Sequence, residues 1–121
     1  MSRVSVFFAL LLVFWPNVIM AEPEGVLPRP DTVTMIDLGA KSCVPCKMMA
    51  PILEKLETEY KGRADVVFID IRDNPEQGRK FGIRAIPTQI FFNKSGQEVG
   101  RHEGFLSEEN IKSALDKLLS E

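Results

Sequence analysis

The chain is poor in the residue types that build disulfide scaffolds and zinc centres. Among its 121 residues are two cysteines, Cys43 and Cys46, and one histidine, His102. Small secreted domains that depend on disulfides carry several of them, and two cysteines allow only one. A structural zinc site usually needs four ligands, and beyond the two cysteines only His102 is of the usual kind. The composition therefore argues against a disulfide scaffold, and we expect no bound metal.

An excess of basic charge is also absent. The chain has 15 lysine and arginine residues against 17 aspartate and glutamate residues, a formal net charge of −2. Domains that bind nucleic acid usually gather basic residues on one surface. We therefore predict no nucleic-acid partner, and we expect neither a cofactor nor an oligomer. The length fits a single domain.

The first 21 residues carry the one long apolar run. Arg3 supplies a positive charge, residues 4–15 are almost wholly apolar, and Ala21 stands before a polar stretch. This layout is typical of a secretory signal peptide cleaved after Ala21. The alternative is an uncleaved membrane anchor, because residues 4–21 are close to the roughly 17–25 residues that span a bilayer. Both interpretations place the rest of the chain outside the cytoplasm, in the periplasm or another extracytoplasmic space.

The remaining sequence divides into a linker and a domain. Residues 22–31 contain three prolines and a glycine and predict a linker, which leaves residues 32–121 as the domain. Strand patterns cover residues 32–38, 66–71, 88–92 and 98–103, and helical patterns cover residues 46–60, 74–82 and the segment after Ser107. Pro51 should kink the first helix or end its first segment. Because helices separate the first three strands, we expect these strands to be parallel, with the last one antiparallel at an edge.

The two cysteines stand at the junction between the first predicted strand and the first predicted helix. Two residues, Val44 and Pro45, separate them. A helix N-terminus has unpaired N–H groups and a partial positive charge, which favour a thiolate over a thiol. The thiolate is the nucleophile in disulfide exchange, so the position makes Cys43 reactive. The pair is placed to alternate between a dithiol and a disulfide.

Three other roles for the cysteine pair remain open from the residues alone. A structural disulfide would close so short a loop that it would stabilise the fold little. A zinc half-site would need further ligands. A Cu(I) site could combine two thiolates with Met48 or Met49, although Met49 falls on the apolar face of the helix, where methionine usually fills the core.

Several motifs in the domain recur together in one known family. They are Ile36-Asp37-Leu38, Cys43-Val44-Pro45-Cys46-Lys47-Met48 with Ala50-Pro51, Asp73-Asn74-Pro75, and Phe81-Gly82-Ile83-Arg84-Ala85-Ile86-Pro87-Thr88. With these motifs, the chain from about residue 32 onward resembles the thioredoxin family. The resemblance implies an α/β thioredoxin-like fold, with a central mixed sheet of about four strands flanked by helices and a shortened N-terminal part.

The resemblance also implies a role for each site residue. Cys43 corresponds to the exposed attacking thiol and Cys46 to the buried resolving thiol, and the two form the redox disulfide. Asp37 corresponds to a buried carboxylate that exchanges a proton with Cys46. Burial in an apolar strand would raise the pKa of that carboxyl group. The residues alone leave open whether Asp37 instead faces solvent.

Substrate contacts follow from the same resemblance. They fall on Val44 and Pro45 between the cysteines, on Ile86 and Pro87, and on Gly104. Pro87 corresponds to a cis-proline facing the cysteines, and the backbone of Ile86 to the segment that pairs with the substrate chain. Gly104 corresponds to a glycine beside the same groove, although a simple turn before the last helix would also explain it.

The chain departs from the family pattern around the cysteines. Ser42 and Gly39 stand where the family has tryptophans, and Val44 replaces a glycine. Phe68 occupies the position of a lysine that partners the buried aspartate in the family prototype. These differences concern the redox potential and the partners rather than the fold.

Together these features predict an extracytoplasmic thiol–disulfide oxidoreductase that reduces disulfides in client proteins through Cys43 and Cys46. A membrane or soluble thiol reductant would recycle it. A disulfide-forming oxidase or isomerase, and a non-catalytic module that binds Cu(I) or a partner, are the alternatives.

Overall fold

The computed structural model describes residues 26–121, so the predicted signal peptide and residues 22–25 of the predicted linker lie outside the described residues. The elements follow the predicted order. They are β1 (Val33–Gly39), α1 (Val44–Glu59), β2 (Ala64–Asp70), α2 (Pro75–Lys80), β3 (Thr88–Phe92), β4 (Glu98–Glu103) and α3 (Glu108–Leu119). The boundaries of β3 and β4 are as predicted.

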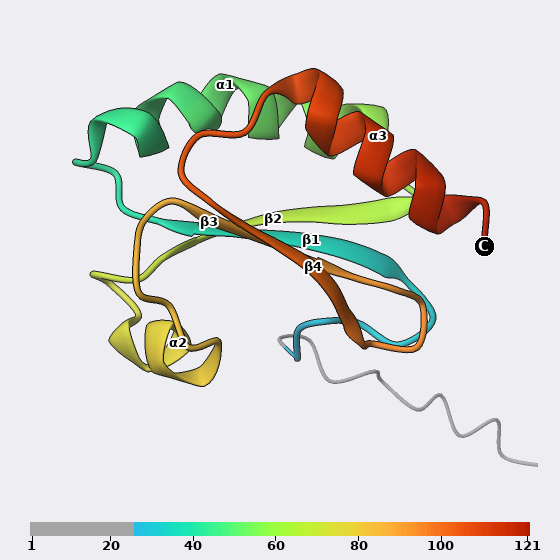
Figure 1. Cartoon of the computed structure of the whole chain (residues 1–121), viewed down its shortest axis with the longest axis horizontal. Helices are drawn as coiled ribbons and strands as arrows, with labels where there is room; N and C mark the ends of the chain where they lie inside the picture. The colour runs from blue at the N-terminus through green and yellow to red at the C-terminus, as the bar shows by residue number, and fades with distance from the viewer. Residues whose placement is uncertain (1–25) are drawn as a thin grey trace, which may run out of the picture.

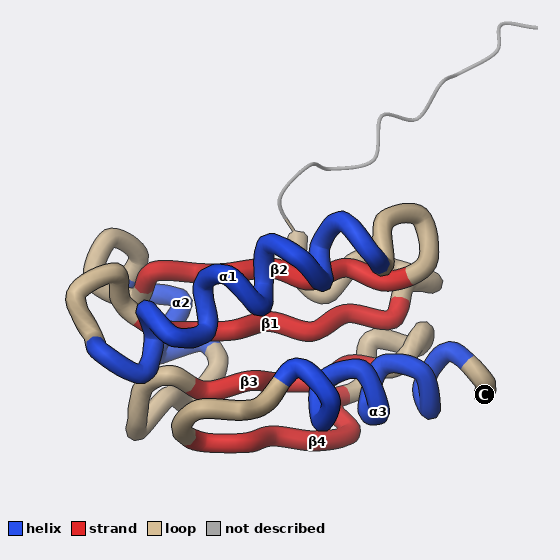
Figure 2. Tube along the Cα trace, turned by 90° about the horizontal axis from the view of Figure 1, so that it is seen from above, coloured by secondary structure: helices blue, strands red, loops and turns tan. Residues whose placement is uncertain are grey.

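The four strands form one mixed sheet in the order β2-β1-β3-β4. Helices α1 and α3 lie side by side on one face of this sheet, and α2 lies on the other (Figures 1 and 2). All seven residues of β1 are buried, because β1 has a neighbouring strand on each side and helices beyond both faces. This confirms the predicted four-stranded mixed sheet flanked by helices.

The predicted direction of the third strand is wrong. β2 runs parallel to β1, as expected, but β3 pairs with β1 in antiparallel register, with Leu38 opposite Thr88. Helix α2 has six residues, which span about 9 Å, whereas a five-residue strand spans roughly 17 Å. The helix by itself therefore does not carry the chain back along the sheet. The chain enters β3 at the end where β2 finished, and this places the start of β3 beside the cysteines.

Helix α1 differs from the prediction in where it begins, near Pro45, and in its continuation through Pro51. It begins at Val44, two residues earlier than predicted, because Pro45 suits the first helical turn. It also continues through Pro51, so the expectation that its first segment could end there is wrong. Pro51 lies on the exposed side of the helix, where water can bond the carbonyl group that loses its N–H partner.

The strand residues alternate between two apolar layers. Val33 and Met35 point toward α1 and α3 and pack with Met49 and Leu115, whereas Ile36 and its neighbours form a smaller cluster on the opposite face. Asp37 follows the alternation of the first set, so its side chain lies on the face that α1 covers. This orientation decides the surroundings of its carboxyl group.

Part of the predicted linker packs against the domain. Leu27 contacts the smaller apolar cluster, and Arg29 forms an ion pair with Asp65 at the start of β2. No helix within residues 26–121 is long and apolar enough to cross a membrane.

Candidate active site

Cys43 and Cys46 are joined by a disulfide at the N-terminal end of α1. Their Cα atoms are 5.1 Å apart. Cys43 has the extended backbone of a helix N-cap, and its side chain is half-buried. Cys46 lies in the first turn and is 4% exposed. The structure therefore presents one sulfur to the surface and encloses the other.

The helix N-terminus interacts directly with the outer sulfur. The backbone N–H of Cys46 donates to Sγ of Cys43 over 3.3 Å, and the first turn of α1 contains no acidic residue. After reduction, the same donor and the helix dipole favour a thiolate at Cys43. Cys46 is shielded from attacking molecules by its burial.

This asymmetry predicts unequal alkylation. In the reduced protein we expect iodoacetamide at pH 7 to modify Cys43 at least about tenfold faster than Cys46, because reactivity follows thiolate content and access. Mass spectrometry of proteolytic fragments after short labelling times measures both rates. The unfolded protein in urea is the control, since both cysteines should then react at similar rates. Equal rates in the folded protein would contradict the assignment of attacking and resolving thiols.

Asp37 is fully buried in the middle of the sheet, as the resemblance implied. Its Oδ1 accepts a hydrogen bond from Nε2 of Gln89 over 2.8 Å, and its Oδ2 has no hydrogen-bond partner among the described residues. Burial raises the pKa of Asp37 from 3.8 to about 6, and the Gln89 hydrogen bond opposes this rise. A carboxyl group of this kind gains and loses a proton near neutral pH, as a group that exchanges a proton with a neighbouring thiol must do.

Asp37 shares its face of the sheet with the inner sulfur. Gly39 lies two residues further along β1, and a Cβ atom added there would stand 3.1 Å from Sγ of Cys46. Side chains two residues apart on a strand point to the same side. The carboxyl group and the resolving cysteine therefore belong to the same layer, between β1 and α1.

The start of β3 lies next to the cysteine loop. Thr88 pairs with Leu38 of β1, so the preceding Ile86 and Pro87 lie beside the end of that strand. The Ile86–Pro87 peptide bond is cis, as predicted. The N–H of Gly104 donates to the carbonyl group of Pro87 over 2.7 Å, and Gly104 has a φ of +98°, which favours glycine. The structure thus brings Pro87 and Gly104 together.

The residues between the cysteines present an apolar surface. The side chain of Val44 is 70% exposed, and that of Met48, one turn further along α1, is 53% exposed. Pro45 is half-buried in the first turn. Exposed apolar residues beside a reactive sulfur suit contact with the side chains of a protein substrate.

Asp70 supports the cysteine loop and was not identified from the sequence. Its carboxylate accepts hydrogen bonds from the backbone N–H of Lys41 over 3.0 Å and from that of Arg72 over 2.9 Å. These bonds lower the pKa of Asp70 and keep the carboxylate ionised. The only sequence signal was an aspartate at the end of an apolar strand, which any solvent-facing strand end could also show.

Ser42, which replaces a family tryptophan, has an arginine partner. The guanidinium group of Arg72 donates to the hydroxyl oxygen of Ser42. Arg72 is itself held by its backbone bond to Asp70. The residue before Cys43 is therefore linked to the loop after β2 by a polar contact.

Beside Cys46 lies a mostly apolar hollow of about 220 Å³. Its lining residues are Ala40, Lys41, Cys46, Lys47, Ala50, Leu53, Glu54 and Phe68. Gly39 has no side chain to fill this region, and Phe68 remains 39% exposed. Of the positions where the chain departs from the family pattern, Phe68 lines this hollow.

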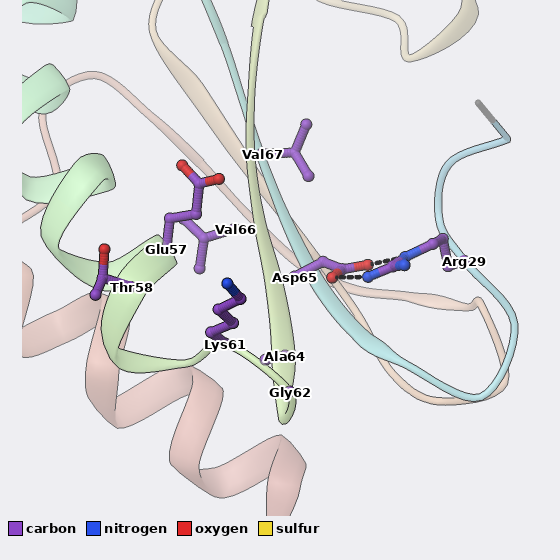
Figure 3. A pocket seen from close by; sticks show the side chains of 9 residues that line it. All are labelled: Arg29, Glu57, Thr58, Lys61, Gly62, Ala64, Asp65, Val66 and Val67. Carbon is purple, nitrogen blue, oxygen red and sulfur yellow. Dashed lines mark hydrogen bonds and ion pairs between the residues drawn. The ribbon is translucent and has the colours of Figure 1, made fainter. Parts of the chain in front are cut away.

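A larger hollow of about 380 Å³ lies at the opposite end of β2 (Figure 3). There, Asp65 pairs with Arg29, and Lys61 and Glu57 stand nearby. Asp70 and the cysteine loop are at the other end of the same strand. Because this hollow lies at the end of β2 far from both sulfurs, we assign it no part in the redox chemistry.

The described residues show no metal centre. Within residues 26–121, no group of three or more His, Cys, Asp or Glu side chains is arranged to hold an ion. Met49, a candidate Cu(I) ligand, is fully buried, and its Sδ accepts a hydrogen bond from the N–H of Leu106 over 3.5 Å. It fills the core, as expected from its position on the helix. Met48 is the remaining exposed thioether beside the cysteines.

Comparisons with known proteins agree with this geometry. The sequence profile of the thioredoxin family matches residues 21–117. Thioredoxins of Staphylococcus aureus strains COL and USA300 are 44% identical over 87 residues, which cover 72% of this chain and 83% of each relative. The crystal structure of chloroplastic thioredoxin z has a TM-score of 0.67 and 31% identity, covering 75% of this chain and 81% of that one. The chain therefore belongs to the thioredoxin family, and it is a thioredoxin-type thiol–disulfide oxidoreductase with its redox-active cysteines at positions 43 and 46.

Proposed function

We propose that the protein is an extracytoplasmic protein-disulfide reductase. The observation that carries the proposal is the placement of the two sulfurs: Cys43 caps α1 with its sulfur accepting a backbone hydrogen bond, and Cys46 is enclosed behind it. An outer nucleophile and an inner resolving thiol are what a disulfide exchanger needs.

The reaction proceeds in two exchanges. The Cys43 thiolate attacks one sulfur of a client disulfide, the client S–S bond breaks, and the released client thiolate takes a proton from solvent. The Cys46 thiol then passes its proton to Asp37 and attacks Sγ of Cys43. The second client thiolate leaves, the Cys43–Cys46 disulfide forms, and two electrons have passed to the client.

Several features of the chain bear on the direction of electron flow and on client binding. Proline precedes the second cysteine and no histidine lies between the cysteines, as in reducing members of the family. Val44 and Met48 offer apolar contacts to the client. The backbone of Ile86, just before Pro87, pairs with the client chain, and Gly104 borders the groove in which that chain would lie. The signal-like segment of residues 1–21 supports export. In an oxidising compartment, a membrane or soluble thiol reductant must return the disulfide to the dithiol.

The reduction potential tests the direction. We expect equilibration with a glutathione buffer to give a value below roughly −220 mV, on the reducing side of the glutaredoxins. We also expect the protein to speed the reduction of insulin by dithiothreitol. A potential near −120 mV, which is the range of a strong oxidase, would contradict the reductase proposal. Stoichiometric Cu(I) binding without any acceleration of insulin reduction would indicate a binding module instead.

Expression of the full chain in a bacterial host tests the location. We expect the protein in the periplasmic fraction or attached to the membrane with the domain facing the periplasm, and a chain without residues 1–21 in the cytoplasm. A full chain that stays in the cytoplasmic fraction would contradict export.

A further inference from the structure

Gln89 is a buried polar residue inside an apolar strand. It lies on β3 directly opposite Asp37 of β1, and both side chains are completely buried. Its Nε2 donates to Oδ1 of Asp37 over 2.8 Å. The residues that follow it in β3, Ile90 to Phe92, are all apolar. Burying an amide and a carboxyl group costs free energy, and the hydrogen bond between them offsets only part of that cost.

The pair is also incompletely hydrogen-bonded. Among the described residues, Oδ2 of Asp37 and Oε1 of Gln89 are both buried without a partner. Buried acceptors without donors are uncommon in folded proteins, and a catalytic or redox role is one of the reasons for which they are kept. A proton on Oδ2 would remove the buried negative charge and leave the Gln89 hydrogen bond to Oδ1 in place. The arrangement is therefore compatible with both protonation states of Asp37.

We propose that Gln89 is a positioning residue for the proton-transfer step: it holds Asp37 through Oδ1 and leaves Oδ2 as the atom that exchanges a proton with Cys46. This inference rests on the proposed function, in which Asp37 receives the proton of the resolving thiol. Gln89 acts through Asp37 and touches neither the sulfurs nor the client.

The surroundings of Asp37 leave Gln89 as the main polar influence on it. Phe68 stands opposite Asp37 on β2 and is apolar. Lys47 and Glu54 of α1 and Lys41 of the preceding loop line the hollow beside Cys46. His102 lies opposite Gln89 on β4 and is exposed. Burial and the Gln89 hydrogen bond account for the altered pKa of Asp37, with no charged residue among the causes. Gln89 favours the ionised form and therefore offsets part of the effect of burial.

Replacement of Gln89 by methionine tests the inference, because methionine has a similar shape and no amide. Two quantities are measured. The first is the pKa of Asp37, from the carboxyl ¹³C shift in the oxidised protein, where neither cysteine titrates. The second is the pH dependence of the resolution rate, from stopped-flow release of a client bound to Cys43. The control is Phe91→Leu, a buried change on the same strand and face that disturbs packing alone.

For Gln89→Met we expect the pKa of Asp37 to rise by about one unit, a tenfold change in the ratio of its two protonation states. The midpoint of the resolution profile should move to higher pH by the same amount. Phe91→Leu should lower stability and move neither midpoint. Combining Asp37→Asn with Gln89→Met should abolish the pH dependence of resolution that the titration of Asp37 causes.

An unchanged pKa in Gln89→Met, or an equal shift in Phe91→Leu, overturns the inference. A shifted pKa with an unmoved resolution profile also overturns it, because Gln89 would then tune a carboxyl group that the reaction does not use. If the wild-type protein reduces no disulfide, the proposed function fails, and the carbon titration still decides whether Gln89 controls the protonation of Asp37.

Discussion

Replacing Cys46 by serine should stop turnover and leave the client attached to Cys43. The N-terminus of α1 still stabilises the Cys43 thiolate, which can therefore attack a client disulfide. A serine hydroxyl at position 46 cannot then displace the client thiolate from the mixed disulfide. Turnover in insulin reduction should fall by a factor on the order of 10³ or more, because the covalent intermediate no longer breaks down. Non-reducing electrophoresis with mass spectrometry should show client chains bound through Cys43.

The matched control is Cys43→Ser. This variant keeps the buried thiol of Cys46, which is only 4% exposed, and removes the outer nucleophile. It should lose turnover to the same extent but trap almost no client. If both variants trapped clients equally, or if Cys43→Ser alone trapped them, the order of attack would be reversed and the roles derived from the helix N-terminus would be wrong.

Replacing Asp37 by asparagine should stabilise the protein at neutral and alkaline pH. The folded-state pKa of Asp37 is about 6 against an ordinary value of 3.8, so folding favours the protonated form. The charged form therefore lowers stability, by about 3 kcal/mol when the pKa difference of about two units is fully expressed. An amide is neutral at every pH and avoids this cost. We expect the asparagine variant to melt about 10 °C higher at pH 8.

The stabilisation should depend on pH in a defined direction. Below pH 3.8 both the folded and unfolded proteins carry a neutral Asp37, so the advantage of asparagine disappears. It grows as the pH rises through the interval from 3.8 to about 6 and stays constant above it. Melting curves of the oxidised proteins between pH 3 and pH 8 measure this.

The same substitution should slow the second exchange. Without a carboxylate to receive the proton of Cys46, resolution should fall by about tenfold to a hundredfold at pH 7, while the first attack by Cys43 is largely retained. The control is Asp73→Asn, which removes an exposed carboxylate near the active site that pairs with Lys41. This control should change neither the melting temperature at pH 8 nor the resolution rate appreciably. Unchanged melting and turnover in Asp37→Asn would exclude the proton-transfer role.

The chemistry of the cysteine pair could be predicted from the sequence because its determinants are local. The spacing of Cys43 and Cys46, the apolar strand before them and the helical pattern after them involve neighbours in the chain. Local patterns also predicted the order of the seven elements within residues 26–121, since strand and helix periodicities depend on residues two to four positions apart. The motif around Pro87 added the second half of the site through the family resemblance.

The direction of β3 could not be obtained in this way. The sequence shows a helical segment between two strands but does not show where that segment lies relative to the sheet. In the structure, the six-residue α2 lies on the face of the sheet opposite α1 and α3, and β3 enters the sheet at the end where β2 finished and runs antiparallel to β1. This reversal sets Ile86 and Pro87 beside the cysteine loop.

The polar support of the site was decided by tertiary structure alone. Asp37 and Gln89 are 52 residues apart and meet because β1 and β3 pair in one particular register. Asp70 binds the backbone of Lys41 across 29 residues for a similar reason. A polar residue in an apolar strand has the same local pattern whether it faces water or the core. The packing of α1 over β1 buries Asp37, and this burial raises the pKa of its carboxyl group to about 6.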